Sequence, residues 1–329
     1  MKKKFLAGVA IASAMTLFLT GCGSGSDDKA SGGSGGGGGV IKVGFAQTGS
    51  ESGWRSANTD SMKKAFSKEN GFDLVFNAAD NDPAAQIAAV RSFINQGVDA
   101  IVVAPIVEDG WDDVFKEAAD AKIPVILEDR TVSSDPSLYA TWIGDNFEAE
   151  GETAGKWAAE NVGTAPTNMV VLEGTTGSSA ANDRSTGFTK AIAGSKIKQI
   201  DSQSGDFTRD GGKKVMEGFL QKYGVKGINL VFAQNDDMAL GAIEAIKAAG
   251  ATPGKDIKIV SIDGVHDGMQ ALADGEINYI VECNPLLGDD AAALVKKVIG
   301  KESVEKANFA KDGAFDQEQA KAALPTRAY

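Results

Sequence analysis

The chain has little of the chemistry on which most enzymes depend. Its 329 residues include a single histidine, His266, and two cysteines, Cys22 and Cys283. Nucleophilic catalysis needs a nucleophile with a base beside it. We expect His266 to be a solvated residue of a polar loop and Cys283 to be a small buried side chain of an apolar strand. No local nucleophile motif surrounds either residue, so the sequence predicts that the protein is not an enzyme.

Basic residues are also scarce. The 33 lysines and arginines stand against 45 acidic residues, which gives a formal net charge of -12. Because nucleic-acid binding requires a basic surface, we expect no nucleic-acid partner. The segment 145–151 lacks the spacing and the closing glutamate of a calcium loop, and the glycine-rich segment 23–39 lacks the flanking strand and GK[ST] of a phosphate loop. We therefore expect no metal and no cofactor.

The N-terminus has the pattern of an export signal. Three lysines precede an apolar run at 5–19, which ends in Leu19-Thr20-Gly21-Cys22. The run is shorter than the roughly 20 residues that a spanning helix needs. The box before Cys22 resembles that of bacterial lipoproteins, which implies that 1–21 is a signal peptide and that Cys22 is acylated.

An acylated Cys22 would hold the protein at the outer face of the cell membrane by its lipid anchor alone. The following segment, 22–39, is too poor in apolar residues to fold and is predicted to be a flexible tether. With Cys22 acylated, only Cys283 is left, so we expect no intramolecular disulfide.

From Val40 onward, short apolar runs alternate with amphipathic segments, over a length that suits two lobes. Predicted strands are 41–45, 74–77, 100–104, 125–127, 169–172, 230–233, 258–262 and 279–282. Predicted helices include 56–68, 83–96, 112–121, 148–161, 211–223 and 238–249. Strict alternation of strands and helices predicts α/β lobes with parallel sheets covered on both faces. A faint repeat of the strand-helix-strand pattern between the two halves predicts two similar sheets.

Polar side chains follow four of these strands. The segments are 49–55, 128–130, 234–237 and 263–264. In open parallel sheets, ligands bind beyond the carboxyl ends of the strands. Carboxylates beside guanidinium groups match the vicinal hydroxyls of a sugar, and an aromatic ring can cover the C–H face of a sugar ring. Trp54 and Phe207 are the candidates for the two aromatic walls.

Each of these features also has a purely architectural interpretation. Asp129 and Arg130 could form a surface ion pair. Asn235 could be the N-cap of the helix that follows it, and Asp263 with its glycine could be an ordinary turn. Trp54 could belong to the core of a lobe. Their joint position at strand ends is what favours a binding site.

The mature chain resembles a known family along its whole length. The segments that carry the resemblance are 49–55, 90–93, 96–100, 202–209, 234–238 and 261–265. They are similar to those of the galactofuranose-binding branch of the ribose-type periplasmic binding proteins. The resemblance implies a type I binding protein of an ABC importer, with two doubly wound lobes joined by three crossovers. It also implies a monosaccharide in the cleft and a membrane permease as partner, and we expect a monomer.

The resemblance places the ligand contacts and the lobes. The implied contacts are Glu51, Ser52, Gly53, Trp54, Arg55, Asp129, Arg130, Arg184, Phe207, Asn235 and Asp263. The N-lobe is expected at 40–144 plus 284–311, and the C-lobe at 145–283 plus 312–329. Cys283 and Asn284 stand where ribose-type relatives often place a ligand amide. The sugar therefore stays open: galactofuranose, another furanose such as fructose in that form, or a pentose.

Three other classes share some of these features. Asp236 with Asp237, or Asp129 with Asp263, could imitate the two carboxylates of a glycosidase. A repressor of the same fold would need an N-terminal helix-turn-helix, where this chain has a signal and a tether. A sugar-sensing protein that feeds a membrane receptor kinase is the alternative closest to an importer component.

Overall fold

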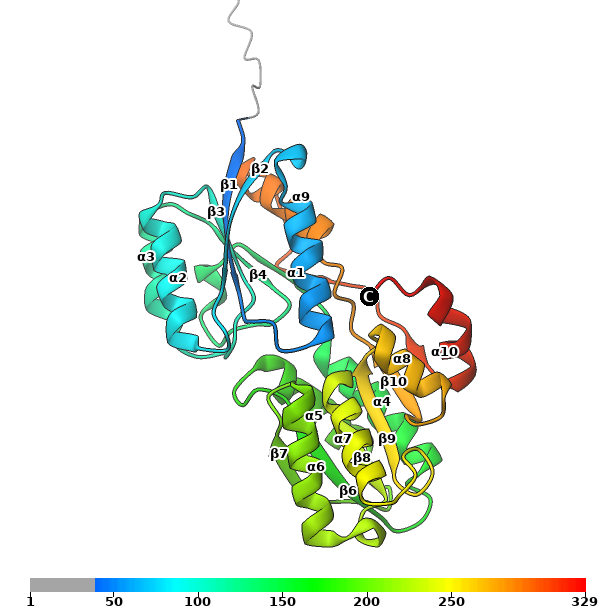
Figure 1. The fold of residues 1–329 in the computed structure, drawn as a ribbon. Helices are drawn as coiled ribbons and strands as arrows, with labels where there is room; N and C mark the ends of the chain where they lie inside the picture. The colour runs from blue at the N-terminus through cyan, green and yellow to red at the C-terminus, as the bar shows by residue number, and fades with distance from the viewer. Residues whose placement is uncertain (1–38) are drawn as a thin grey trace, which may run out of the picture. The chain divides into compact units, whose positions relative to one another are not determined.

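The computed structural model describes residues 39–329. The predicted signal peptide, Cys22 and nearly all of the predicted tether lie outside the described residues. Within 39–329, two six-stranded sheets each carry helices on their faces (Figure 1). The strand orders are β11-β5-β4-β3-β1-β2 and β12-β10-β9-β8-β6-β7. Two parallel-sheet α/β lobes are therefore confirmed.

The first sheet is parallel throughout, and two apolar layers cover its two faces. Its strands are β1 (Ile41–Gln47), β2 (Phe72–Ala78), β3 (Ala100–Val103), β4 (Val125–Glu128), β5 (Thr141–Gly144) and β11 (Ala307–Phe309). Helices α1 (Gly53–Ala65) and α9 (Gly288–Ile299) cover one face. Helices α2 (Pro83–Asn95) and α3 (Asp112–Asp120) cover the other.

The second sheet is parallel except for β12, which pairs antiparallel with β10. Its strands are β6 (Thr167–Glu173), β7 (Ile197–Ser204), β8 (Leu230–Ala233), β9 (Lys258–Asp263), β10 (Tyr279–Glu282) and β12 (Ala314–Phe315). Its helices are α4 (Phe147–Asn161), α5 (Ser179–Ala191), α6 (Arg209–Tyr223), α7 (Asp236–Ala248), α8 (His266–Ala273) and α10 (Gln317–Ala323). Helices α4 and α5 pack together, as do α6 and α7.

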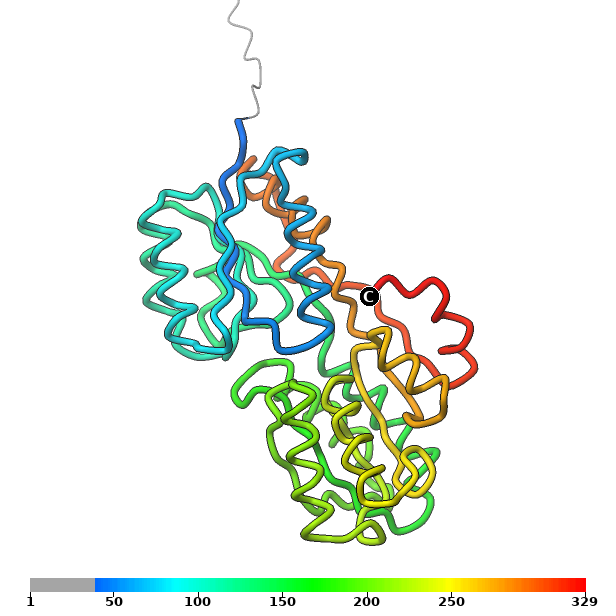
Figure 2. The backbone as a smooth tube through the Cα atoms, viewed as in Figure 1, coloured from blue at the N-terminus to red at the C-terminus, as the bar shows by residue number. Residues whose placement is uncertain are grey.

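The backbone passes between the two sheets three times (Figure 2). The crossovers are the links from β5 to α4, from β10 to α9 and from β11 to β12. Four short 3₁₀ helices complete the described elements: η1 (Lys68–Asn70), η2 (Pro136–Leu138), η3 (Val225–Gly227) and η4 (Leu324–Thr326). In this described part, no helix is both long and apolar enough to span a bilayer.

Capping chemistry decides where several helices begin. Asp82 accepts hydrogen bonds from two backbone N–H groups of α2, and Pro83 stands at the first helical position, where its missing N–H is harmless. Ser52 caps α1 by accepting from the N–H of Arg55. Helix α1 therefore begins at Gly53, three residues before the predicted start, because the cap and not the apolar pattern sets its end.

Two local predictions were wrong. His266 is not a loop residue but the first residue of α8, although its side chain is exposed as expected. Cys283 lies just after β10 and begins a crossover, although it is buried as predicted. Strands β5, β7, β11 and β12 were not predicted, because they are short or lie at an edge with mostly polar, half-exposed residues.

Candidate functional site

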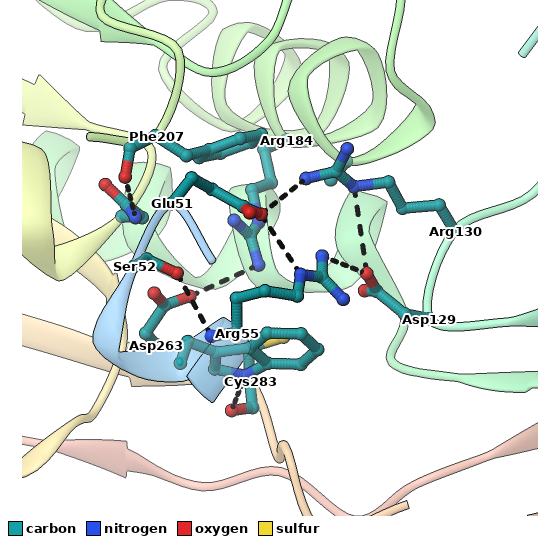
Figure 3. Close-up of a pocket in the computed structure, with 12 residues that line it drawn as sticks. Glu51, Ser52, Arg55, Asp129, Arg130, Arg184, Phe207, Asp263 and Cys283 are labelled. Atoms are coloured by element: carbon teal, nitrogen blue, oxygen red, sulfur yellow. Dashed lines mark hydrogen bonds and ion pairs between the residues drawn. The ribbon is translucent and has the colours of Figure 1, made fainter. Parts of the chain in front are cut away.

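Residues from both lobes line one cavity with about 280 Å³ of empty space (Figure 3). Its lining residues are Glu51, Ser52, Trp54, Arg55, Asp129, Arg130, Ala180, Arg184, Phe207, Asn235, Asp263 and Cys283. The structure thus brings together ten of the eleven predicted contacts. Gly53 is not part of the lining, and its N–H instead bonds the carboxylate of Asp237. Charged, polar and aromatic side chains that converge on one small cavity suit a small polar ligand.

The first lobe contributes two arginines and two carboxylates. Arg55 Nε lies 3.0 Å from Glu51 Oε1, and Arg55 Nη2 lies 2.5 Å from Asp129 Oδ2. Arg130 stands farther off, at 3.7 Å from each of the same two carboxylates. All four side chains are at most 5% exposed. The interpretation of Asp129 and Arg130 as a surface ion pair was therefore wrong.

Two guanidinium nitrogens in this cluster lack a partner. Arg55 Nη1 and Arg130 Nε have no hydrogen-bond acceptor among residues 39–329, although both atoms are buried. Buried polar groups are almost always paired, and leaving a charged donor unpaired is costly. Both residues line the cavity, so a ligand with oxygen acceptors would complete their hydrogen bonds.

The second lobe contributes Arg184 and Asp263. Arg184 is held from within the lobe: its Nε lies 2.8 Å from Glu150 Oε2, and its Nη1 donates to the carbonyl of Gln234 at 2.7 Å. Its Nη2 lies 3.7 Å from Asp263 Oδ1. Asp263 has a φ of 127°, a conformation that non-glycine residues rarely adopt. Such strain gathers at functional sites, where the surrounding structure enforces it.

The two aromatic candidates are both fixed by hydrogen bonds. Trp54 comes from α1, packs with the core of the second lobe, and donates its Nε1–H to the carbonyl of Cys283 at 2.8 Å. The architectural interpretation of Trp54 is thus partly right, since it is buried in a core and also lines the cavity. Phe207 has a φ of 60°, and Asn235 Nδ2 donates to its carbonyl at 3.0 Å. A Cβ at Gly174 would overlap the ring of Phe207, so glycine is required beneath it.

The interpretation of Asn235 as an N-cap is right. Asn235 Oδ1 accepts from the N–H of Met238 and caps α7. Asp263 is the last residue of β9, and Asp236 accepts from the N–H groups of Gly264 and Val265, which follow it. Asn235 and Asp263 also line the cavity, whereas Asp236 and Asp237 do not. A glycosidase-like pair of Asp236 and Asp237 is therefore not placed at the cavity.

Burial and neighbouring charges shift several pKa values in this cluster. Burial, and then Arg55, lowers the pKa of Arg130 to about 10. Burial alone would raise the pKa of Glu51, but Arg55 and Arg130 outweigh it and hold that pKa below its ordinary value. Behind the cavity, burial and then Asp129 raise the pKa of Glu128 to about 8. Glu128 is therefore largely protonated at neutral pH, which leaves the two arginines matched to Glu51 and Asp129.

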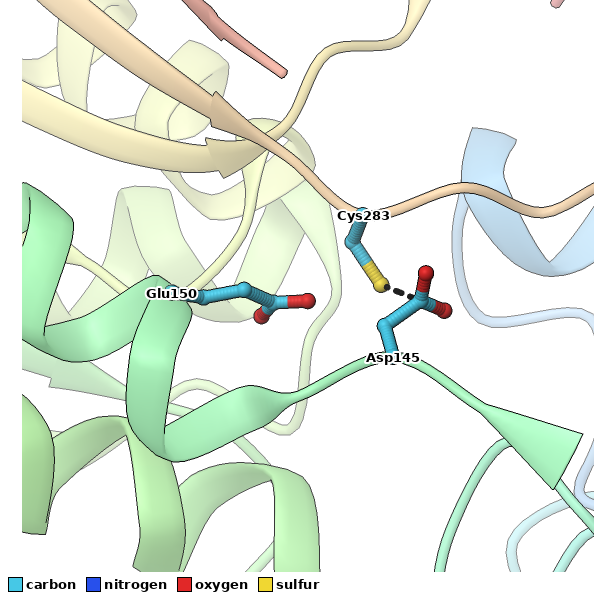
Figure 4. Close-up of side chains that lie close together, drawn as sticks. All are labelled: Asp145, Glu150 and Cys283. Carbon is cyan, nitrogen blue, oxygen red and sulfur yellow. Dashed lines mark hydrogen bonds between the residues drawn. The ribbon is translucent and has the colours of Figure 1, made fainter. Parts of the chain in front are cut away.

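A second cluster lies where the crossovers begin (Figure 4). Asp145, Glu150 and Cys283 each offer a ligand atom within 4.8 Å of the others. The thiol of Cys283 donates to Asp145 Oδ2 at 3.5 Å. Burial raises the pKa of Glu150 to about 7 and raises the pKa values of Asp145 and Cys283 well above their ordinary ranges. Cys283 is thus a protonated thiol, and Glu150 beside it pairs with the cation of Arg184.

The residues that the sequence missed are Ala180 and Cys283 in the lining and Glu150 behind Arg184. Cys283 follows the end of β10, so the strand-end rule that found Asp129 and Asp263 could have found it too. Nothing in the sequence signals Glu150, because it is 34 positions away from Arg184 and lies on a different helix.

Comparison with known proteins places the chain in a family. Residues 43–303 match the family described as periplasmic binding protein domain. The chain is 48% identical to the galactofuranose-binding protein YtfQ of Escherichia coli K12 over 260 residues, covering 78% of this chain and 81% of that protein. It is 39% identical to the fructose import binding protein FruE of Bifidobacterium longum over 338 residues, covering 99% of each.

A solved structure agrees with these relatives. A Mycobacterium smegmatis protein in complex with β-D-fucofuranose matches with a TM-score of 0.85 at 55% identity, covering 88% of this chain and 95% of that chain. The relatives are solute-binding proteins and not enzymes, as the sequence predicted. The chain therefore belongs to the periplasmic binding protein family, among its ribose-type sugar-binding members.

Proposed function

We propose that this chain captures a neutral monosaccharide in its furanose form between the two lobes and delivers it to the permease of an ABC importer. The observation that carries the proposal is the cavity itself. It joins forked guanidinium and carboxyl groups with two aromatic side chains, and two of its buried guanidinium nitrogens lack an acceptor. Sugar hydroxyls both donate and accept, so they can satisfy both kinds of group.

The charges of the lining favour a neutral ligand. Arg55 and Arg130 face Glu51 and Asp129, and Arg184 is paired with Glu150 behind the cavity. A sugar phosphate would have to compete with carboxylates that already hold these cations. We therefore expect free sugars to bind and sugar phosphates to bind much more weakly.

The furanose form is supported by what the relatives bind. One is named for galactofuranose, one for fructose, and one was solved with β-D-fucofuranose. The proposed ligand contacts are the ten residues named from the sequence that line the cavity, and Gly53 supports them as the first residue of α1.

We also propose the processing and the lobes predicted from the sequence. Residues 1–21 are removed, Cys22 carries the lipid at the outer face of the cell membrane, and 22–39 is the tether. The N-lobe is 40–144 plus 284–311, and the C-lobe is 145–283 plus 312–329. Replacing Cys22 with alanine should release the protein from the membrane or leave it unprocessed; a processed Cys22→Ala protein that stays membrane-bound contradicts the anchor.

Calorimetric titration with deoxy sugars tests the ring form. D-galactose closes a five-membered ring through its 4-hydroxyl and a six-membered ring through its 5-hydroxyl. 5-Deoxygalactose should therefore bind, while 4-deoxygalactose, which cannot form a furanose, should not. D-fructose, D-fucose, L-arabinose and D-ribose complete the panel. Tight binding of 4-deoxygalactose would contradict a furanose site.

Deletion of the permease gene tests import against sensing. Loss of growth on the bound sugar in the deletion strain would favour import over sensing.

A further inference from the structure

The lobes also meet outside the cavity, through hydrogen bonds that join backbone N–H groups of the first lobe to acceptors of the second. Gly53 N–H donates to Asp237 Oδ2 at 2.8 Å. Thr131 N–H donates to Ser179 Oγ at 3.0 Å. The bond to Asp237 is distinctive, because its acceptor is a charged side chain that does not line the cavity.

Asp237 is prepared for this bond by its own lobe. It lies in the first turn of α7 and is only 7% exposed. Its Oδ1 accepts from Arg209 Nε at 3.3 Å, which turns the other carboxylate oxygen toward the first lobe. The second lobe thus holds the carboxylate in place, and the first lobe donates a hydrogen bond to it.

Gly53 offers the matching chemistry. It is the first residue of α1, and the first N–H groups of a helix have no acceptor within the helix and carry a partial positive charge. The N-cap Ser52 accepts from the N–H of Arg55 and so does not serve Gly53. Asp237 therefore completes the cap of α1 from across the cleft, next to Trp54 and Arg55.

We propose that Asp237 is a positioning residue that caps helix α1 only when the lobes are closed and thereby stabilises the closed, sugar-holding state. This inference rests on the proposed function. When the lobes part, Gly53 and Asp237 must separate and return to water, so the bond favours closure. Because Asp237 is not among the residues that line the cavity, its contribution should be the same for every sugar that the closed form holds.

Asp237→Ala and Asp237→Asn test this role, with Asp267→Ala as the matched control. Asp267 pairs with the same Arg209, at 3.1 Å, but is exposed and makes no bond to the first lobe. Calorimetric titration should show that Asp237→Ala weakens binding of each sugar by the same factor, about tenfold, with faster dissociation. Asp237→Asn keeps an acceptor without the charge and should fall in between, and Asp267→Ala should match the wild type.

The ratio of affinities between sugars decides between roles. A changed ratio in Asp237→Ala would mean that Asp237 contacts the sugar, and unchanged affinities would mean that the bond does not favour closure; either result overturns the proposal. Hydrogen exchange of the Gly53 amide gives a readout that depends on no particular sugar. With a saturating sugar present it should become faster in Asp237→Ala, and unchanged exchange under that condition would refute the cap. A wild type that binds none of the sugars would instead refute the proposed function.

Discussion

Removing Arg130 should separate sugar binding from folding. Arg130 lies 3.7 Å from Glu51 and from Asp129, whereas Arg55 bonds both carboxylates more closely, at 3.0 and 2.5 Å. Among residues 39–329, its guanidinium donates one hydrogen bond, from Nη1 to the carbonyl of Ile106 at 3.2 Å. The two carboxylates therefore keep their main partner when Arg130 is replaced.

The magnitudes follow from these contacts. Arg130 Nε is buried without an acceptor, so a sugar oxygen would form a charge-assisted bond there, worth about 1.5 to 3 kcal/mol. Arg130→Ala should accordingly weaken sugar binding by roughly ten- to 150-fold. The loss of one bond to a carbonyl should change the free energy of unfolding of the sugar-free protein by about 1 kcal/mol or less, partly offset because Arg130 and Arg55 repel each other.

Calorimetric titration at pH 7 and thermal unfolding without sugar measure the two quantities separately. Arg91→Ala is the matched control, because Arg91 is an exposed arginine of the same lobe, paired with Glu117 far from the cavity. Wild-type affinity in Arg130→Ala would refute the assignment of Arg130 to the site. A large drop in the stability of the sugar-free variant would refute the claim that its role is confined to the ligand.

Three further outcomes are expected. Arg184→Ala should weaken sugar binding and should also lower the free energy of unfolding by about 3 kcal/mol, because it leaves the buried Glu150 without its cation. Thermal unfolding that matches the wild type would contradict this. Gly174→Ala should weaken sugar binding by displacing Phe207, while Gly218→Ala, with open space around its Cβ position, should bind as the wild type does; equal affinities would show that the Phe207 wall is not needed. Folded Glu128, with its pKa of about 8, keeps a proton that the unfolded chain releases near 4.5. The free energy of unfolding should therefore fall between about pH 5 and 8, by up to about 1.4 kcal/mol per pH unit for this proton, and the melting temperature should fall with it. Glu128→Gln should flatten this slope, and a melting temperature that rises over this range would contradict the prediction.

The sequence predicted the fold well where burial is complete. Central strands such as β3 and β8 are continuous apolar runs buried along their whole length, so their pattern is unambiguous. The edge strand β7 contains Lys198, Gln199 and Asp201, and a strand with one solvent-facing side and polar residues on it is hard to tell from a loop. The two- and three-residue strands β12 and β11 are too short to leave a pattern.

The candidate site was predicted because strand ends converge in open parallel sheets. That rule found Asp129 and Asp263, and the family resemblance added Arg184, which lies inside a helix. Contacts between distant positions left no trace in the sequence. The cap of Gly53 by Asp237 spans 184 positions, and it depends on how the two lobes meet.

A crystal structure grown with the sugar that titrates most tightly tests the central claim most directly. We predict a single five-membered ring in the cavity between the two lobes, with its oxygens within hydrogen-bonding distance of Arg55 Nη1 and Arg130 Nε and its C–H faces against Trp54 and Phe207. A sugar bound elsewhere, or a six-membered ring in the cavity that leaves both nitrogens unpaired, would contradict the account.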